Sequence, residues 1–327
     1  MDKSATDCHT IGNFFGVNGK KLQRQYKRHL SSFTTWTERE HAHQWIIYPE
    51  NMGTHLSIDE VALSQGELYT IVTNKKFKGK KGSLVAIIAG TKADQVIEHI
   101  NKIDYKIRCC VKEITLDMAN TMKLISKRCF SKAVQVTDRF HVQKLALEAL
   151  QEIRIKYRWE AMDFENQLIL KAKAENKQYV PNLLSNGDSI KQLLARSRYL
   201  LYKSREKWTQ NQKQRASMLF ELYPDIKTAY NLSQQLRAIY NNHNNKTIAM
   251  TKLAHWYRKV EESGFKNFNI LLNTIMINYQ SILNYFDNRS TNASAESFNA
   301  KIKAFRSQFR GVRNIDFFLF RLTNLFA

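Results

Sequence analysis

Few residues in this sequence interrupt regular structure. Only three prolines and eleven glycines occur among 327 residues, which favours a helix-rich fold with few long loops. No apolar run reaches the roughly 18 residues that a bilayer-spanning helix needs. The first fifteen residues also lack the apolar core of a signal peptide. We therefore expect a cytoplasmic protein that has no membrane partner.

Cysteine pairs of the kind that bind zinc are absent as well. The four cysteines are Cys8, Cys109, Cys110 and Cys129, and no two of them form a C-x-x-C pair. No pair of histidines lies near them at zinc-finger spacing. We expect four reduced, structural thiols and no zinc module.

Acidic side chains are scarce relative to basic ones. The chain has 51 Lys and Arg against 29 Asp and Glu, a formal net charge of +22 and a pI near 9.8. The hydrophobic fraction of 43% is ordinary for a folded protein. A charge of this size predicts a polyanionic partner, with nucleic acid as the first candidate and an anionic membrane surface as the second.

Residues 1–53 are polar and basic. Two interpretations of their basic cluster are equally supported, namely an arm that contacts DNA phosphates and an ordinary solvated helix face. The cluster consists of Lys20, Lys21, Arg24, Lys27 and Arg28.

Short apolar runs and amphipathic stretches alternate between residues 54 and 158. The pattern predicts strands at 56–59, 67–73 and 83–89, a helix at 93–103, a strand at 111–116, a helix at 119–129, a strand at 133–136 and a helix at 139–159. Three consecutive strands followed by alternating helices and strands is the order of a ribonuclease-H-like sheet. The pattern alone leaves other mixed α/β folds open.

The rest of the chain is predicted to be helical. Strand patterns disappear between residues 160 and 285, where apolar residues follow helical spacing. A helix is expected after the Ser- and Thr-rich stretch at 290–294, and an apolar helix is expected at 316–326.

Glu296 is unusual because it is the only acid in a basic segment. Six basic residues and this single carboxylate lie between Arg289 and Arg313. A segment that only attracts phosphate gains nothing from a carboxylate, whereas a segment that cuts phosphodiesters needs one to hold a metal ion. Helical spacing places Glu296, Asn299 and Lys303 on one face, separate from an apolar stripe that begins at Phe298.

Asp59 and Asp117 are candidate partners of Glu296 because each lies at the end of a strand-like run. Three carboxylates of this kind can hold Mg²⁺, which prefers oxygen ligands. Each also has a simpler explanation, since Asp117 could cap the following helix and Glu296 could serve only the helix dipole. Asp138 also lies where a strand meets a helix, so it is the rival second carboxylate.

Several stretches together resemble the ISL3 type of bacterial insertion-sequence transposases. They are Ser57-Ile58-Asp59-Glu60 with Gly66 and Tyr69, Asp117, Asp138-Arg139-Phe140-His141, and residues 292–303 with 310–313. The resemblance implies a ribonuclease-H-like α/β core, interrupted by an all-helical insertion. It also implies a DDE-type transposase that cuts DNA at transposon ends and joins the freed 3′-hydroxyl to target DNA, with Mg²⁺ as cofactor and Mn²⁺ as a substitute.

Carried over by position, the resemblance assigns roles to individual residues. Asp59, Asp117 and Glu296 would be the catalytic metal ligands, with supporting roles for Asp138, His141 and Asn299. Basic residues after Glu296 would hold DNA phosphates, namely Lys301, Lys303, Arg306, Arg310 and Arg313.

The resemblance also implies an order of domains and a set of partners. Residues 1–53 would form a basic arm, 54–158 the first part of the core, 159–286 the helical insertion and 287–327 the helices that complete the core. Members of the family usually begin with a zinc module and a helix-turn-helix that recognise the element's ends. Two alternatives stay open for this chain, namely that it lacks such a domain or that a separately encoded protein supplies it. We further expect a homo-oligomer on DNA, at the bacterial nucleoid. Two alternatives stay open, namely a related nuclease or resolvase and a non-catalytic DNA-binding remnant.

Overall fold

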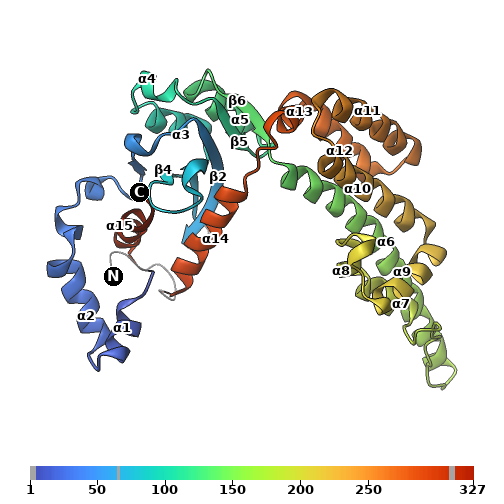
Figure 1. Cartoon of the computed structure of the whole chain (residues 1–327). Helices are drawn as coiled ribbons and strands as arrows, with labels where there is room; N and C mark the ends of the chain where they lie inside the picture. The colour runs from blue at the N-terminus through green and yellow to red at the C-terminus, as the bar shows by residue number, and fades with distance from the viewer. Residues whose placement is uncertain (1–4, 65–66, 309–313) are drawn as a thin grey trace. The chain divides into compact units, whose positions relative to one another are not determined.

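The chain forms two compact units in a computed structural model that describes residues 5–64, 67–308 and 314–327 (Figure 1). Unit 1 comprises Met1–Asp138 and Asn288–Ala327, and unit 2 comprises Arg139–Asp287. The predicted boundary of the helical insertion, at residue 159, falls inside one continuous helix, α6 (Arg139–Ala174). Because this helix packs against other helices of unit 2, unit 2 begins at Arg139.

Unit 1 is built on one mixed sheet, which has six strands among the described residues. Its spatial order is β1-β4-β3-β2-β5-β6. The strands are β1 (Trp45–Ile47), β2 (His55–Ser64), β3 (Glu67–Asn74), β4 (Leu84–Ala89), β5 (Glu113–Leu116) and β6 (Val134–Thr137).

The strand directions are those of a ribonuclease-H-like fold. β2, β3 and β4 pair antiparallel, and β5 and β6 continue the sheet parallel to β2. The predicted fold class is therefore confirmed. β1 adds an edge strand antiparallel to β4, which the sequence pattern did not predict.

Helices cover both faces of the sheet in unit 1. One face packs on α3 (Ala93–Ile100) and α5 (Asn120–Cys129), with the short α4 (Tyr105–Arg108) between them in the chain. The other face packs on α14 (Ala293–Gln308) and α15 (Ile315–Phe326). In α14 the predicted apolar stripe is buried, since Phe298, Ile302 and Phe305 are at most 1% exposed.

The N-terminal residues pack on α15. Tyr26, Phe33, Phe317 and Phe320 share a small buried cluster with Cys8. The helices and helical turns of this part of unit 1 are α1 (Cys8–Phe14), α2 (Gly19–Gln25), η1 (Tyr26–Leu30), η2 (Ser32–Thr35), η3 (Thr37–Glu40), η4 (Pro49–Asn51) and, between β3 and β4, η5 (Lys75–Phe77).

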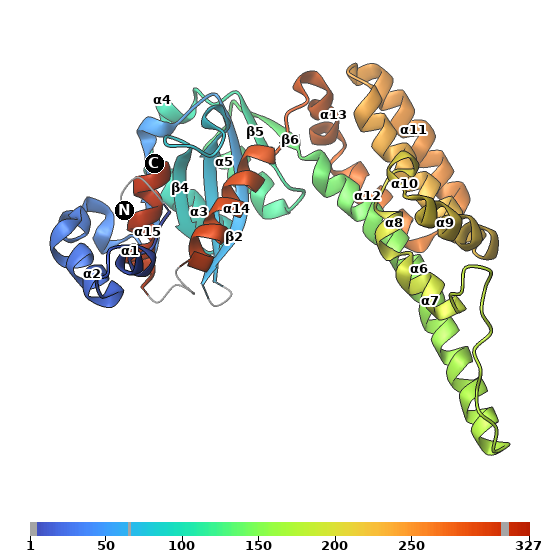
Figure 2. The ribbon, with the colours of Figure 1, turned by 60° about the horizontal axis from the view of Figure 1, so that its bottom comes forward.

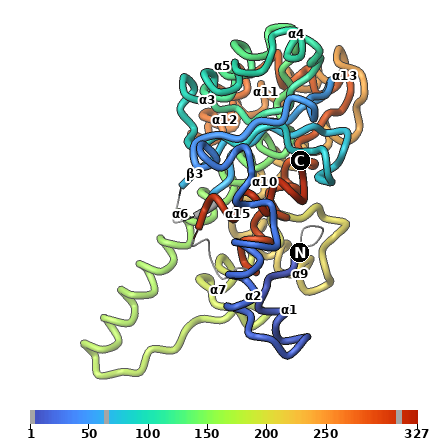
Figure 3. The backbone as a smooth tube through the Cα atoms, turned by 90° about the vertical axis from the view of Figure 1, so that its left-hand side faces the viewer, coloured from blue at the N-terminus to red at the C-terminus, as the bar shows by residue number. Residues whose placement is uncertain are grey.

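α1 and α2 lie side by side (Figure 3). Their contact depends on two glycines. A Cβ atom on Gly12 would lie 2.8 Å from the Gly19 Cα, and one on Gly19 would lie 2.6 Å from the His9 Cα. Larger residues at either position would therefore force the two helices apart.

Unit 2 consists of helices, as the sequence predicted for most of this region. α6 extends beyond the other helices of the unit, and the chain after it runs back alongside (Figure 2). The remaining helices are α7 (Ile190–Arg196), α8 (Arg198–Leu201), η6 (Arg205–Lys207), α9 (Gln210–Leu222), α10 (Pro224–Asn242), α11 (Lys246–Ser263), α12 (Lys266–Ile277) and α13 (Tyr279–Asn288). Within the described ranges of the chain, no helix is long and apolar enough to cross a membrane.

Candidate active site

Asp59 and Asp117 come from neighbouring parallel strands. Ser57 of β2 pairs with Thr115 of β5. Two residues further along each strand, this register brings Asp59 level with Asp117. Adjacent strands are about 4.8 Å apart, and residues two apart on a strand share a face. The fold therefore brings these two predicted residues together, although 57 residues separate them in sequence.

Asp138 extends the same row of acids. Leu116 of β5 pairs with Thr137 of β6, and the Asp138 N–H donates to the Leu116 carbonyl at 3.0 Å. Asp138 therefore lies level with Asp117 on the next strand, and it is only 1% exposed. Both candidates for the second carboxylate occupy this end of the sheet, so position alone does not choose between them. His141, on α6, is half-buried and belongs to unit 2.

Two asparagines, one just before α14 and one within it, contact Asp59 of β2. The side-chain amide of Asn299 donates to Asp59 Oδ2 at 2.7 Å, and the amide of Asn292 lies 3.5 Å from the same oxygen. Glu296 lies between these two asparagines in sequence, four residues after Asn292 and three before Asn299, so all three share one helix face. The two asparagines contact Asp59, and Glu296 is exposed. The ribbons show α14 beside β2 (Figures 1 and 2).

Buried oxygens without hydrogen-bond partners surround Asp59. Within the described ranges they include Ser57 Oγ, Asn292 Oδ1 and Asn299 Oδ1. Burying such an acceptor without a partner has a free-energy cost, so several at one place suggest a ligand site. Together with the carboxylates they form an oxygen donor set, which is the kind that Mg²⁺ prefers.

The carboxylates are bonded to protein donors in this structure. Asp59 Oδ1 accepts from the Glu60 N–H at 2.8 Å, and Asp117 Oδ1 accepts from the Ala119 N–H at 2.9 Å. Across the described part of the chain, no three His, Cys, Asp or Glu side chains are grouped so that they could hold a metal ion as they stand. Metal binding would therefore require these side chains to change their hydrogen bonds.

Negative charge accumulates at this end of the sheet. The pKa of Glu60 is raised, first by burial and then by the charges of Asp117 and Asp59. Glu60 starts from the opposite sheet face, beside Ile58, which belongs to the core under α3 and α5. Its carboxyl group still senses both aspartates, so a cation bound there would relieve repulsion among at least three acids.

A buried polar cluster anchors the chain just before α14, and the sequence did not reveal it. Lys75 Nζ lies 3.5 Å from Glu113 Oε1 and donates to Thr115 Oγ1 at 2.8 Å. Ser290 bonds both Lys75 and Glu113, and the Asn288 amide donates to Glu113 at 3.3 Å. Burial lowers the pKa of Lys75, against the raising effect of Glu113. The sequence feature that could have indicated this cluster is Glu113, an acid at the start of an apolar strand.

Several basic residues predicted to contact DNA bond to the protein itself. Lys301 Nζ donates to the Gly79 carbonyl at 2.8 Å, and Arg306 donates to the Ala62 carbonyl at 3.1 Å. Lys27 Nζ lies 5.2 Å from the centre of the Phe33 ring. The remaining described members of the set are exposed, namely Lys20, Lys21, Arg24, Arg28 and Lys303. Arg310 and Arg313 lie outside the described residues.

Sheet order and the acids at its parallel strands define a ribonuclease-H-like protein. Comparison with protein families identifies it further. The family DDE_Tnp_ISL3, described as "Transposase", matches residues 56–322, and the chain belongs to this ISL3 transposase family.

Two individual proteins are similar to the chain. The transposase for insertion sequence element IS1001 of Bordetella parapertussis is 22% identical over 273 residues, which cover 83% of this chain and 61% of that protein. The chain thus spans about three-fifths of the length of this relative. The Drosophila P element transposase strand transfer complex matches with 12% identity and a TM-score of 0.38, over 97% of this chain and 86% of that one.

Proposed function

We propose that this chain is a DDE-type DNA transposase, which cleaves DNA at insertion-sequence ends and transfers the strands into target DNA. The observation that carries the proposal is the junction of α14 with β2, where Asn299 bonds Asp59 beside Asp117. This junction brings a helix that bears Glu296 to the strand positions of two aspartates. Membership of a transposase family supports the same reaction.

Asp59, Asp117 and Glu296 would hold Mg²⁺, or Mn²⁺ in its place. The bound metal would stabilise negative charge on the reacting phosphate and activate the attacking oxygen. Asp59 and Asp117 come from rigid strands, whereas Glu296 comes from a helix whose position depends on Asn299 and on the cluster around Lys75. Asp138 is the alternative second ligand, and His141 keeps a supporting role.

The proposed partners are DNA, further copies of the chain and an end-recognition protein. Phosphate contacts by lysine and arginine position DNA without selecting a sequence. Recognition of particular ends therefore needs side chains that read base edges, which we propose a separately encoded protein supplies. The exposed cluster on α2 and η1, from Lys20 to Arg28, would add phosphate contacts.

A non-catalytic DNA-binding protein is the second candidate. It is favoured by one observation, namely that Asp59 and Asp117 already bond to protein donors and do not converge as a metal site. This candidate predicts DNA binding without cleavage under any divalent cation. A related nuclease or resolvase would cleave DNA but would not join it to a target.

Cleavage and joining of labelled DNA would distinguish these functions. Wild-type protein is incubated with labelled element ends, a supercoiled target plasmid and Mg²⁺ or Mn²⁺, with and without a co-encoded partner chain. The transposase proposal expects cleaved ends and joined products from wild type. It expects neither from the Asp59→Asn, Asp117→Asn and Glu296→Gln variants.

Asp94→Asn is the matched control. Asp94 is an exposed acid in the first turn of α3, on the opposite side of the sheet. This variant should cut and join as wild type does. Full activity of all three site variants would exclude the proposed ligands. Cleavage without joined products would favour the nuclease or resolvase.

A further inference from the structure

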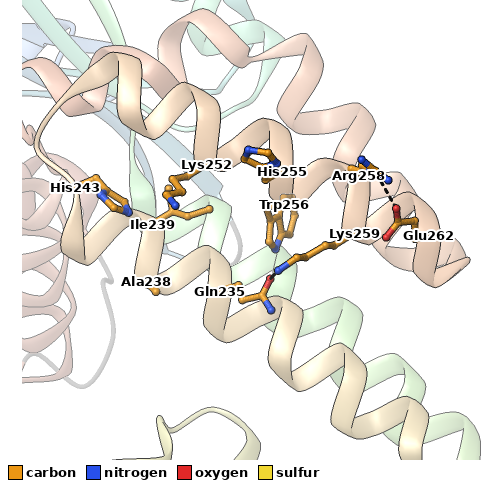
Figure 4. Close-up of a pocket in the computed structure, with 10 residues that line it drawn as sticks. All are labelled: Gln235, Ala238, Ile239, His243, Lys252, His255, Trp256, Arg258, Lys259 and Glu262. Carbon is orange, nitrogen blue, oxygen red and sulfur yellow. Dashed lines mark hydrogen bonds and ion pairs between the residues drawn. The ribbon is translucent and has the colours of Figure 1, made fainter.

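A groove in unit 2 runs between α10 and α11 (Figure 4). It is a cavity of about 600 Å³. A second hollow shares Gln235, Lys259 and Glu262 with it and continues past Thr228 and Ser263. The two hollows together form an elongated channel, a shape that suits a polymer better than a compact small molecule.

Buried apolar side chains form the base of the groove. Trp256 is only 2% exposed, and its indole N–H donates to the Leu232 carbonyl of α10 at 2.8 Å. Ile239, at 6% exposure, lies beside it among the lining residues. Because this contact ties α11 to α10, the groove is a preformed feature of the helix pair.

Basic side chains dominate the rim of the groove. Lys252, Arg258, Lys259 and two histidines line it, against one acid, Glu262. Arg258 and Glu262 form an ion pair at 2.8 Å and so neutralise each other. Figure 4 shows this pair at one end of the groove, with Lys252 away from it and the Lys259 side chain directed towards Gln235.

Lys252 and Lys259 are left without acidic partners. Among the ion pairs of the described chain neither lysine takes part, and Lys259 Nζ donates to the neutral amide oxygen of Gln235 at 3.3 Å. Elsewhere in the same unit exposed lysines do have acids nearby, as Lys144 has Glu148 at 3.8 Å and Lys156 has Glu160 at 3.9 Å. Uncompensated cations on a preformed groove indicate an anionic ligand.

We propose that this groove binds the phosphodiester backbone of DNA. Lys252, His255 and Lys259 follow the spacing i, i+3, i+7, so they share one face of α11 over about 10 Å of helix axis. Phosphates of one DNA strand are about 3.4 Å apart along the duplex axis, so a row of this length laid along that axis spans about three phosphate intervals. The inference rests on the proposed function for the identity of the anion, and it adds a DNA contact in unit 2 that makes no use of the carboxylates.

Salt-dependent DNA binding by a double variant tests the groove. Lys252→Gln is combined with Lys259→Gln, and the dissociation constant is measured by fluorescence anisotropy in EDTA at several KCl concentrations. The measurement is made with two labelled ligands, namely a random-sequence duplex and a single strand of equal length. Losing two phosphate contacts should make the salt slope shallower by about 1.8 for duplex or about 1.4 for single strand, and should weaken binding at least about tenfold near 0.1 M salt.

Lys144→Gln combined with Lys156→Gln is the matched control. It removes the same charge from α6 of the same unit, at lysines that already have acidic partners. We expect its salt slope to stay within error of wild type. Equal effects of the two double variants, or no effect of the groove variant, would overturn the groove site.

The cleavage assay with Mg²⁺ is run on the same preparations. If the groove variant cleaves normally and binds DNA as wild type does, the groove is not a DNA-binding site, and the proposed function is unaffected. If wild type binds neither the duplex nor the single strand, both the groove site and the proposed function are excluded.

Discussion

Two lysine sites, one in each unit, differ in how the lysine charge is compensated. The side chain of Lys75 in unit 1 is only 15% exposed, and it contacts Glu113, Thr115 and Ser290. Lys252 and Lys259 of unit 2 line an open groove and have no acid to pair with among the described residues. Burial of a charge is costly unless it is paired, whereas a solvated cation needs no partner. The paired lysine therefore serves the fold, and the unpaired lysines are available for a ligand.

The same contrast applies to the two proposed sites. The acids of unit 1 lie on strands and on a helix that a buried cluster anchors, which suits chemistry that needs fixed geometry. The cations of unit 2 lie on helix surfaces, which suits contacts that tolerate any DNA sequence. Substitutions should therefore separate chemistry from DNA binding, and the following predictions test that separation.

The largest effect is expected from Asp59→Asn. Loss of a metal ligand removes several kcal/mol of transition-state stabilisation, so cleavage should fall by at least ~10³-fold. DNA binding in EDTA should stay equal or become tighter, because a repelling charge is lost. Cleavage rates and anisotropy measured on one preparation check both parts. If the variant cleaves DNA normally, or if its DNA binding falls in proportion to its cleavage, chemistry and DNA binding do not depend on separate residues.

Lys75→Met should destabilise unit 1 strongly. The substitution leaves Glu113 buried without its cation, which typically costs ~3–5 kcal/mol. Urea unfolding followed by circular dichroism measures the change. Lys76→Met is the control, because Lys76 is the exposed neighbour in the same turn. Equal midpoints for the two variants would show that the buried cluster does not anchor the segment before α14.

Asn299→Ala should impair chemistry without abolishing it. Asn299 donates to Asp59 at 2.7 Å, and loss of a residue that orients a metal ligand typically costs about 10–100-fold in activity or metal affinity. The Mg²⁺ concentration for half-maximal cleavage should rise, which a purely structural role would not produce. Ser297→Ala, at an exposed position of the same helix, is the control. If the Mg²⁺ concentration for half-maximal cleavage does not change, Asn299 does not position Asp59 for metal binding.

Tyr230→Phe should have the smallest effect, and the effect should depend on pH. Burial raises the pKa of Tyr230 to about 12, and its hydroxyl donates to the Lys203 carbonyl at 2.9 Å. The folded pKa exceeds the unfolded value of about 10, so this stability is complete below pH ~10 and is lost as pH rises towards ~12.

The loss of the hydroxyl should lower stability by ~1 kcal/mol at pH 8 and by less at pH 11. Urea midpoints of wild type and Tyr230→Phe at the two pH values measure this difference. If the difference between the two urea midpoints increases from pH 8 to pH 11, the raised pKa of Tyr230 is contradicted.

Local patterns in the sequence predicted β2 to β6 along the chain and the two aspartates on β2 and just after β5. Asp59 was expected at the end of its strand, but β2 continues to Ser64. The parallel register then aligns Asp59 with Asp117. The contacts of Asp59 with Asn292 and Asn299 join residues more than 230 positions apart, so local patterns could not predict them.

Two features of the structure could not be read from local patterns. The helix predicted from Arg139 towards Trp159 continues without a break to Ala174, so α6 runs through the predicted boundary at 159. Helical spacing also could not reveal that Lys301 and Arg306 reach backbone carbonyls on neighbouring segments.

Iron-directed cleavage of the polypeptide would test the shared metal site most directly. Fe²⁺ bound in place of Mg²⁺ reduces added hydrogen peroxide to hydroxide and a hydroxyl radical, with ascorbate returning Fe³⁺ to Fe²⁺. The radical cuts the nearest backbone, and the fragments are mapped by mass spectrometry. If Asp59, Asp117 and Glu296 share a cation, cuts should cluster near all three positions, and excess Mg²⁺ should suppress them. Cuts that spare the start of α14, or that do not respond to Mg²⁺, would contradict a common metal site.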